Sequence, residues 1–345
     1  MDSKLFFNYD KVDRAGVPFN FIIGGRGTGK TYGALDKVYN WWKYTGGAFL
    51  YTRRTEIEVE SVADESYNPF KALNADKGYT VSADYTKKVS CGHFYDIDPR
   101  IAKETGQESH ICGYSSAISV FGRMRGADLS DVDTWVYDEF CGEVNVKRIK
   151  GEADLFFNAY ETVNRNREVA GKPPVTVYFL SNAVDIATPL LYELGLTDRI
   201  AAMQLTGQRV FTDKERGIHV EILGKLGISF EKEKSALYKL TAGTRFYQHA
   251  IDNDFAYDNM SNVEKQPLKE YNPTIQLGSL YIYSHKQTDR YYVCRSRAVC
   301  PFVYTDDATN TFRRLWGVKF YNLLMSGKCL FSDYSCKKEM LSYWE

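Results

Sequence analysis

The stretch Gly24-Gly25-Arg26-Gly27-Thr28-Gly29-Lys30-Thr31 decides the fold. Residues 17–23 before it are mostly apolar, which predicts a buried strand, and residues 31–44 after it have the pattern of a helix. Two further glycines, Gly46 and Gly47, end this helix, and residues 48–52 form a second predicted strand. Strand, glycine loop, helix and strand make a βαβ unit. We therefore expect an α/β domain with a central, mainly parallel sheet.

The glycine loop has the spacing of a Walker A motif, Gly24-x-x-x-x-Gly29-Lys30-Thr31. Glycines allow positive φ and let backbone N–H groups approach phosphates, and the following helix directs its positive end at them. Lys30 is expected to lie between the β- and γ-phosphates, and Thr31 to offer its hydroxyl to Mg²⁺. A glycine-rich turn can match by chance, but the flanking strand and helix favour an ATP site formed by the whole loop.

Two acidic residues follow a third short predicted strand, residues 134–137. Asp138 is expected to hold the Mg²⁺ shell through water, and Glu139 to polarise the attacking water as general base. The adjacent glutamate is typical of additional-strand P-loop ATPases rather than of kinases or Ras-like GTPases. Acidic turns are common at strand ends, so this interpretation depends on the order of the two motifs.

A fourth predicted strand, residues 175–180, ends in Ser181-Asn182. A polar side chain at this position can sense the γ-phosphate and orient water, and we favour Asn182 for that role. An asparagine that merely caps the end of a buried strand explains the same pattern equally well.

The length of 345 residues suggests two domains. We expect a P-loop ATPase domain over residues 1–205, a partly helical linker over 206–237 and a smaller α+β domain over 238–345. In the last of these, tyrosine-rich runs at 279–284 and 291–299 predict a β-hairpin, and apolar spacing predicts a helix over 311–325.

Composition narrows the class of protein. Lysine plus arginine equal aspartate plus glutamate, 44 against 44, so nucleic-acid contact requires local patches or a ring of subunits. The seven cysteines are odd in number and form no CxxC pair, which disfavours disulfides and zinc.

The N-terminal residues have no apolar signal region, and no run approaches the ~20 apolar residues that span a bilayer. We expect a cytosolic protein without membrane contact.

Hydrolysis in ring ATPases usually needs an arginine finger from a neighbouring subunit. A surface arginine in a salt bridge is the alternative for every candidate, and the residues alone do not choose among them. The candidates are Arg26, Arg53, Arg54, Arg123, Arg125, Arg165 and Arg167.

Taken in order, these motifs resemble the DNA-packaging ATPases of phi29-like tailed phages. The resemblance covers about the first 200 residues and is weaker afterwards, although residues 312–331 are also similar. The segments that carry it are Met1-Asp2, Leu5-Phe6, Asn8, the loop from Gly24 to Thr31, Arg53-Arg54, Asp138-Glu139-Phe140, Arg165-Asn166-Arg167-Glu168 and Leu180-Ser181-Asn182-Ala183-Val184.

The resemblance implies a homopentameric ring at the portal vertex of an empty prohead, in the host cytoplasm, that hydrolyses ATP to drive double-stranded DNA into the capsid. It implies that Arg165 acts in trans and that Arg125 contributes to nucleotide handling or subunit signalling. Arg53 falls where the family has an arginine on the second strand, and the resemblance implies that it contributes to nucleotide binding. A lysine that the family has slightly later is Glu56 here, so a basic role is not expected at that position.

The resemblance further implies an RNase H-like C-terminal domain without nuclease activity, which contacts DNA and in some members a packaging RNA. The order and spacing of the acids at 252, 254, 289, 306, 307 and 333 do not indicate a two-metal nuclease. A hairpin with Lys286, Arg290, Arg295 and Arg297 beside tyrosines is either a nucleic-acid patch or a solvated face. A terminase-like ATPase that cuts DNA and a non-translocating assembly factor remain the alternative functions.

Overall fold

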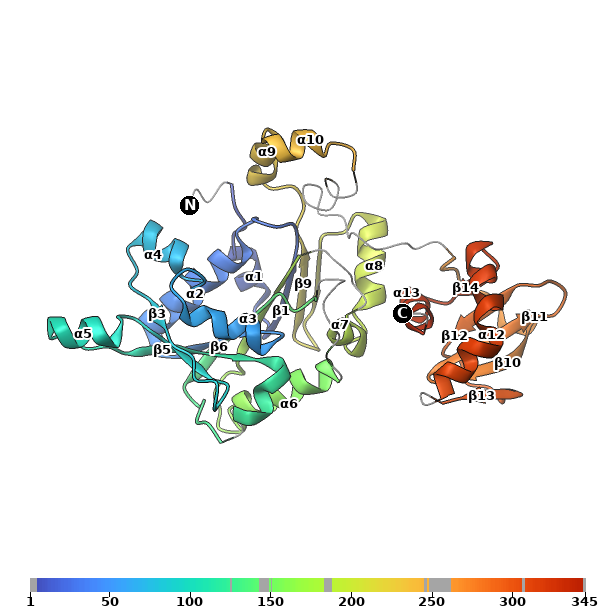
Figure 1. Cartoon of the computed structure of the whole chain (residues 1–345), viewed down its shortest axis with the longest axis horizontal. Coiled ribbons are helices and arrows are strands. Elements are labelled where there is room, and N and C mark those ends of the chain that lie inside the picture. The colour runs from blue at the N-terminus through green and yellow to red at the C-terminus, as the bar shows by residue number, and fades with distance from the viewer. Residues whose placement is uncertain are drawn as a thin grey trace. The chain divides into compact units, whose positions relative to one another are not determined.

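The computed structural model of the chain describes residues 5–124, 126–142, 149, 151–182, 188–244, 247, 262–305 and 308–343. The chain forms two compact units (Figure 1). The first comprises residues 1–185 and 206–257, and the second comprises residues 186–205 and 258–345. This division is interleaved along the chain, whereas the sequence predicted consecutive domains at 1–205, 206–237 and 238–345.

The first unit is built on a mixed, mainly parallel sheet with the strand order β3-β4-β5-β2-β6-β7-β1-β9-β8. The central strands from β5 to β9 run parallel, and the antiparallel pairs lie at the two edges, where β3, β4 and β8 are found. The strands are β1 (Phe19–Ile23), β2 (Ala48–Arg53), β3 (Ser82–Ala83), β4 (Gly92–Tyr95), β5 (Ile111–Ala117), β6 (Val132–Asp138), β7 (Thr176–Ser181), β8 (Val210–Asp213) and β9 (Ile218–Ile222).

Helices cover this sheet, and the longest of them follows the glycine loop. That helix, α2 (Lys30–Thr45), buries Ala34, Leu35 and Val38 in a core shared with β1, β2, β6 and β7. The other helices of the unit are α1 (Asp10–Ala15), α3 (Glu56–Glu60), α4 (Lys71–Lys77), α5 (Pro99–Thr105), α6 (Glu152–Asn164), α9 (Gly227–Glu233) and α10 (Ala236–Leu240). The predicted strand–loop–helix–strand unit is therefore confirmed.

The segment predicted as a linker contains a β-hairpin as well as helices. Strands β8 and β9 pair antiparallel, and β9 also pairs parallel with β1, so the hairpin extends the main sheet. All five residues of β9 are buried, since both faces of the strand are covered. We expected a partly helical linker over residues 206–237, and the structure places this hairpin within it. The β9 sequence Ile218-His219-Val220-Glu221-Ile222 does alternate apolar and polar residues, so the strand has a period-2 signal that was missed in a charged, glycine-containing segment.

The second unit contains a sheet with the order β13-β10-β11-β12-β14. The predicted hairpin is confirmed as the antiparallel pair β11–β12, and the predicted helix over 311–325 is α12 (Thr309–Met325). The remaining elements are α7 (Pro189–Glu193), α8 (Thr197–Thr206), β10 (Tyr271–Leu277), β11 (Leu280–His285), β12 (Tyr291–Cys294), β13 (Phe302–Tyr304), β14 (Cys329–Phe331) and α13 (Tyr334–Ser342).

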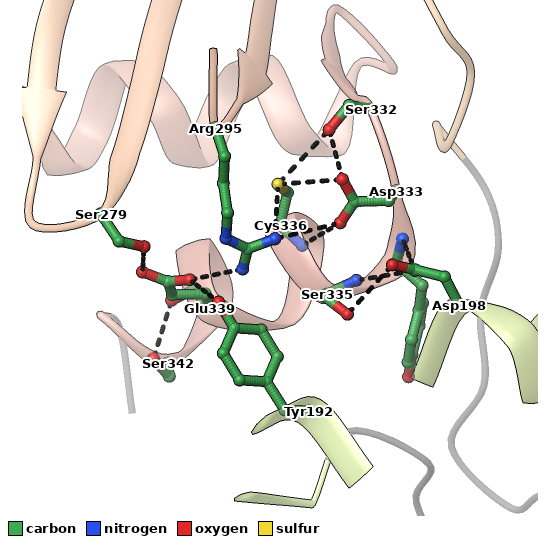
Figure 2. Close-up of polar contacts among 11 residues, drawn as sticks. Tyr192, Asp198, Ser279, Arg295, Ser332, Asp333, Ser335, Cys336, Glu339 and Ser342 are labelled. Carbon is green, nitrogen blue, oxygen red and sulfur yellow. Dashed lines mark hydrogen bonds and ion pairs between the residues drawn. The ribbon is translucent and has the colours of Figure 1, made fainter. Parts of the chain in front are cut away.

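A polar network ties α7 and α8 to this second unit (Figure 2). The Arg295 guanidinium lies over the ring of Tyr192 at 4.7 Å and pairs with Glu339 at 2.7 Å, while the Tyr192 hydroxyl donates to Glu339 at 3.1 Å. From α8, Asp198 Oδ1 accepts from the backbone N–H of Tyr334 at 3.1 Å, at the start of α13. These contacts explain why residues 186–205 belong with the C-terminal elements.

Helices long and apolar enough to cross a membrane are absent from the described part of the chain.

Candidate nucleotide site

The glycine loop has the backbone that phosphate binding requires. Gly27 and Gly29 have φ of 68° and 87°, conformations that favour glycine, and α2 begins directly afterwards at Lys30. The loop is braced internally, since the Thr28 hydroxyl donates to Gly25 O at 2.9 Å. Gly24 packs so closely on the residue after β9 that a Cβ added to it would lie 2.6 Å from Leu223 Cβ. The start of the loop thus has no room for a side chain.

A pocket of about 490 Å³ opens beside the loop, a size that falls within the range of small-molecule sites. The carboxyl ends of the parallel strands β6 and β7 contribute to it, as expected for a ligand site in an α/β sheet. The residues that line it are Phe6, Arg26, Gly27, Thr28, Gly29, Lys30, Thr31, Tyr32, Ala72, Asp138, Glu139, Ser181 and Asn182. The predicted loop, acidic pair and polar strand end therefore meet at one place.

Lys30 is buried at the base of the pocket. Its ammonium donates to Gly24 O at 2.9 Å, to Gly25 O at 2.8 Å and to Thr28 Oγ1 at 3.3 Å. Burial lowers the pKa of Lys30 to about 8, against the opposing effect of the Asp138 carboxylate. The direct partners of the Lys30 ammonium thus include neutral carbonyl groups. A negatively charged phosphate would compensate its charge better than these carbonyls do.

Thr31 and Asp138 present two hard oxygen ligands side by side. The Thr31 hydroxyl donates to Asp138 Oδ1 at 3.1 Å, and the buried hydroxyl of Tyr51 donates to Asp138 Oδ2 at 3.1 Å. Hydroxyl and carboxylate oxygens are the ligands that Mg²⁺ prefers, and it usually takes only one or two protein ligands beside water and phosphate. These two residues fit a Mg²⁺ ion that accompanies a nucleotide.

Glu139 has an unusual backbone conformation. Its φ is +53°, a left-handed value that a non-glycine residue adopts only when its surroundings impose it. The strand pairing resumes at once, because Phe140 N donates to Leu180 O at 3.2 Å. The carboxylate is 45% exposed and lies 3.5 Å from the Arg53 guanidinium. Glu139 is therefore turned into the pocket while remaining accessible to water.

Asn182 lies at the end of β7, where the sequence predicted a polar sensor. Its Oδ1 accepts from Lys30 Nζ at 3.5 Å, the limit of a hydrogen bond. The neighbouring Ser181 hydroxyl donates to Asn182 O at 2.9 Å. The Asn182 side chain thus lies beside the lysine of the loop and lines the pocket.

A sequence model described as the podovirus DNA encapsidation protein (Gp16) matches residues 1–276 of the chain. The chain belongs to this family. The DNA packaging protein of Bacillus phage phi29 is 30% identical over 267 residues, which span 77% of this chain and 70% of that protein. The DNA packaging protein of Bacillus phage B103 is 26% identical over 260 residues, 75% of this chain and 69% of that protein.

Solved structures share the fold of this encapsidation-family chain. The bacteriophage Phi-29 viral genome packaging motor assembly has a TM-score of 0.65 at 23% identity, covering 99% of this chain and 98% of that chain. The Phi-28 gp11 DNA packaging motor has a TM-score of 0.61 at 16% identity, covering 98% and 97%. At these identities the likeness concerns the fold alone.

The remaining arginines have different surroundings. Arg165 follows α6 and donates to Ala127 O at 3.1 Å, in the loop before β6, whereas Asp138 ends that strand. Arg167 pairs with Asp133 at 2.5 Å. Arg125, predicted to handle nucleotide, lies outside the described residues.

Tyr51 and Phe6 are among the residues at the site that the sequence did not identify. Tyr51 lies two positions before Arg53 on the same face of β2, and its hydroxyl accepts from Arg53 Nε at 3.1 Å. Period-2 spacing from a candidate arginine was the signal that could have identified it. Phe6 lines the pocket from the N-terminal segment, where Phe7 N donates to Thr28 O at 2.9 Å, and no local pattern indicated that contact.

Proposed function

We propose that the chain is an ATPase that drives double-stranded DNA into an empty phage prohead, as one subunit of a ring at the portal vertex. One observation carries the proposal: Lys30, Thr31, Asp138 and Glu139 line a single pocket in a chain of the DNA encapsidation family. The relatives that are named DNA packaging proteins support the same role.

Each residue of the pocket has a task in hydrolysis. Bound Mg²⁺–ATP would supply an electrophilic γ-phosphate whose charge is partly neutralised by the metal. Thr31 and Asp138 would hold the metal, and Lys30 would contact the phosphates. Glu139, accessible at the pocket wall, takes the proton of the attacking water, and Asn182 orients that water.

Arg165 is proposed as the arginine finger of a neighbouring subunit. Its anchoring at Ala127, before β6, puts it away from the carboxyl ends of the strands where its own chain's pocket opens, which favours action in trans. Arg125 is proposed to assist nucleotide handling or signalling between subunits. The ring is proposed to be a homopentamer.

The second unit is proposed to be an RNase H-like domain that contacts DNA, or a packaging RNA, without cutting. Two of its acids already have structural partners, since Asp289 pairs with Lys328 at 2.6 Å and Asp333 caps α13 through Cys336 N at 2.7 Å. Packaging would take place in the host cytoplasm, with the ring attached transiently to the prohead.

ATP turnover with proheads and DNA tests the chemistry. Glu139→Gln should still bind Mg²⁺–ATP but lose about 10²–10⁴-fold in turnover, because the base is removed and the pocket is kept. Lys30→Ala should weaken binding itself. DNA protected from nuclease inside proheads reports packaging. Wild-type ATPase activity that neither DNA nor proheads stimulate would instead support an assembly factor, and metal-dependent DNA cleavage would support a terminase-like nuclease.

Mixed rings test the finger. Arg165→Ala should bind ATP yet lose turnover by on the order of 10³-fold or more. Adding Glu139→Gln subunits, which retain Arg165, should restore part of the activity. The matched control is Arg100→Ala, since that guanidinium is 89% exposed and pairs only locally with Asp98. Normal turnover of assembled Arg165→Ala rings would refute the assignment.

A further inference from the structure

A second lysine lies on the glycine loop, from a helix about 200 residues further along the chain. Lys232, on α9, donates through its ammonium to Arg26 O within the loop. A Cβ placed on Gly27 would lie 2.7 Å from Lys232 Nζ. The ammonium therefore rests directly on the part of the loop that lines the pocket.

The backbone holds α9 in this position independently of Lys232. Ile228 N donates to Leu5 O at 3.0 Å, and two residues later Phe7 N donates to Thr28 O at 2.9 Å. The N-terminal segment thus bridges α9 and the glycine loop. The position of α9, from which the Lys232 side chain extends, therefore rests on these backbone contacts.

The charge of Lys232 is poorly compensated. No described carboxylate forms an ion pair with it, and its contact is a neutral carbonyl. Burial lowers its pKa, and the same ammonium contributes to the lowered pKa of Lys30. Two cations therefore converge on one short loop without an anion between them, an arrangement that a polyphosphate would stabilise.

We propose that Lys232 is a second phosphate-binding lysine, which exchanges the carbonyl of Arg26 for a phosphate oxygen of the bound nucleotide. The inference rests on the proposed nucleotide site and extends it to α9. Occupancy of the pocket would then be sensed by α9, a helix that lies outside the strand, glycine loop and acidic pair that form the site. The ligand class is a nucleoside triphosphate recognised through its phosphate chain.

Three variants of the full chain test this role. Lys232→Met keeps the aliphatic stem and removes the charge, and Lys232→Arg keeps the charge. Lys234→Ala is the matched control, because Lys234 is two residues away and pairs with Glu231 at 2.8 Å. Thermal melting checks that all three fold. Affinities for Mg²⁺–ATP and for inorganic tripolyphosphate are measured by calorimetry.

Lys232→Met should weaken both ligands by about tenfold or more, as expected for loss of a charge-assisted hydrogen bond. Lys232→Arg should bind within about threefold of the wild type, and Lys234→Ala should match it. ATP should also slow amide exchange in residues 227–233 of the wild type, but not of Lys232→Met.

Unchanged affinities in Lys232→Met would overturn the inference and leave the proposed function standing. A loss for ATP without a loss for tripolyphosphate would also overturn it, since the contact would then not be to phosphate. A wild type that binds neither ligand would overturn both the inference and the proposed function.

Discussion

Arg53 reaches both acidic residues of the site: its Nη2 lies 3.7 Å from Asp138 Oδ2 and 3.5 Å from Glu139 Oε2. Burial opposes the charge of Arg53, but the neighbouring Tyr51, Asp138 and Glu139 outweigh it and raise the Arg53 pKa, so the guanidinium stays charged. Two adjacent carboxylates repel each other when no metal is bound. Arg53 compensates that repulsion and holds the Glu139 side chain.

Replacing Arg53 should therefore impair chemistry more than binding. Arg53→Ala is expected to lower kcat by on the order of tenfold or more, because Glu139 loses the group that orients it, with Kd for ATP within about threefold. Steady-state turnover measures kcat, and equilibrium binding of ATP measures Kd. Arg123→Ala is the control, since that exposed arginine pairs with Glu56 at 3.4 Å. A change in Kd alone would contradict the orienting role.

Thr31 should set the magnesium requirement. Thr31→Ala removes the hydroxyl that donates to Asp138, so we expect the Mg²⁺ concentration for half-maximal turnover to rise about tenfold. Thr31→Ser retains the hydroxyl and should behave like the wild type. Magnesium titrations at saturating ATP distinguish the variants, and equal titration curves for Ala and Ser would exclude Thr31 as a ligand.

Gly24 should tolerate a side chain only if Leu223, directly after β9, shifts. Gly24→Ala places a Cβ 2.6 Å from Leu223 Cβ and should distort the loop, weakening ATP binding strongly. Leu223→Ala leaves its own Cβ in place but frees the rest of the side chain, so the double variant should recover part of the affinity. Gly122→Ala is the control, with nothing within 4 Å of its Cβ. No recovery would mean that the outer atoms of the Leu223 side chain do not account for the loss.

The buried pair of Arg54 and Glu152 should be costly to break. Both residues are at most 5% exposed, and their two hydrogen bonds measure 2.6 and 2.8 Å. Glu152→Ala leaves a buried cation and should destabilise the first unit by about 3–5 kcal/mol. The double variant with Arg54→Met and Glu152→Met should recover at least half of that loss. Calorimetric unfolding measures the stability of the single and the double variant. A double variant that is less stable than Glu152→Ala would contradict this account.

Arg295 should hold α7 and α8 against the C-terminal elements of the second unit. Arg295→Ala removes the contact with the Tyr192 ring and the ion pair with Glu339, so amide exchange in residues 188–206 should accelerate about tenfold. Arg297→Ala, at an exposed neighbouring position, should leave exchange unchanged. Equal exchange in both variants would show that apolar packing alone holds these helices.

The sequence predicted those parts of the site that follow from local pattern and sheet geometry. Lys30, Asp138 and Asn182 meet because each lies at or beyond the carboxyl end of a parallel strand, and these ends share one edge of the sheet. The residues that contact them were harder to predict from the sequence. Lys232 and Phe6 reach the loop from segments in which no local pattern indicated that contact, and Arg295 meets Tyr192 across about 100 residues of chain. Long-range contacts of this kind leave no periodic trace in a single sequence.

The interleaved division of the chain has a topological consequence. The backbone passes between the units three times, at 185–186, 205–206 and 257–258. Cleavage of any one of these connections divides at least one unit between two fragments: a cut at 185–186 separates residues 206–257 from the rest of the first unit, and a cut at 257–258 separates residues 186–205 from the rest of the second. A nicked chain would thus behave as a split protein, migrating as two bands under denaturing conditions but as one particle in native chromatography.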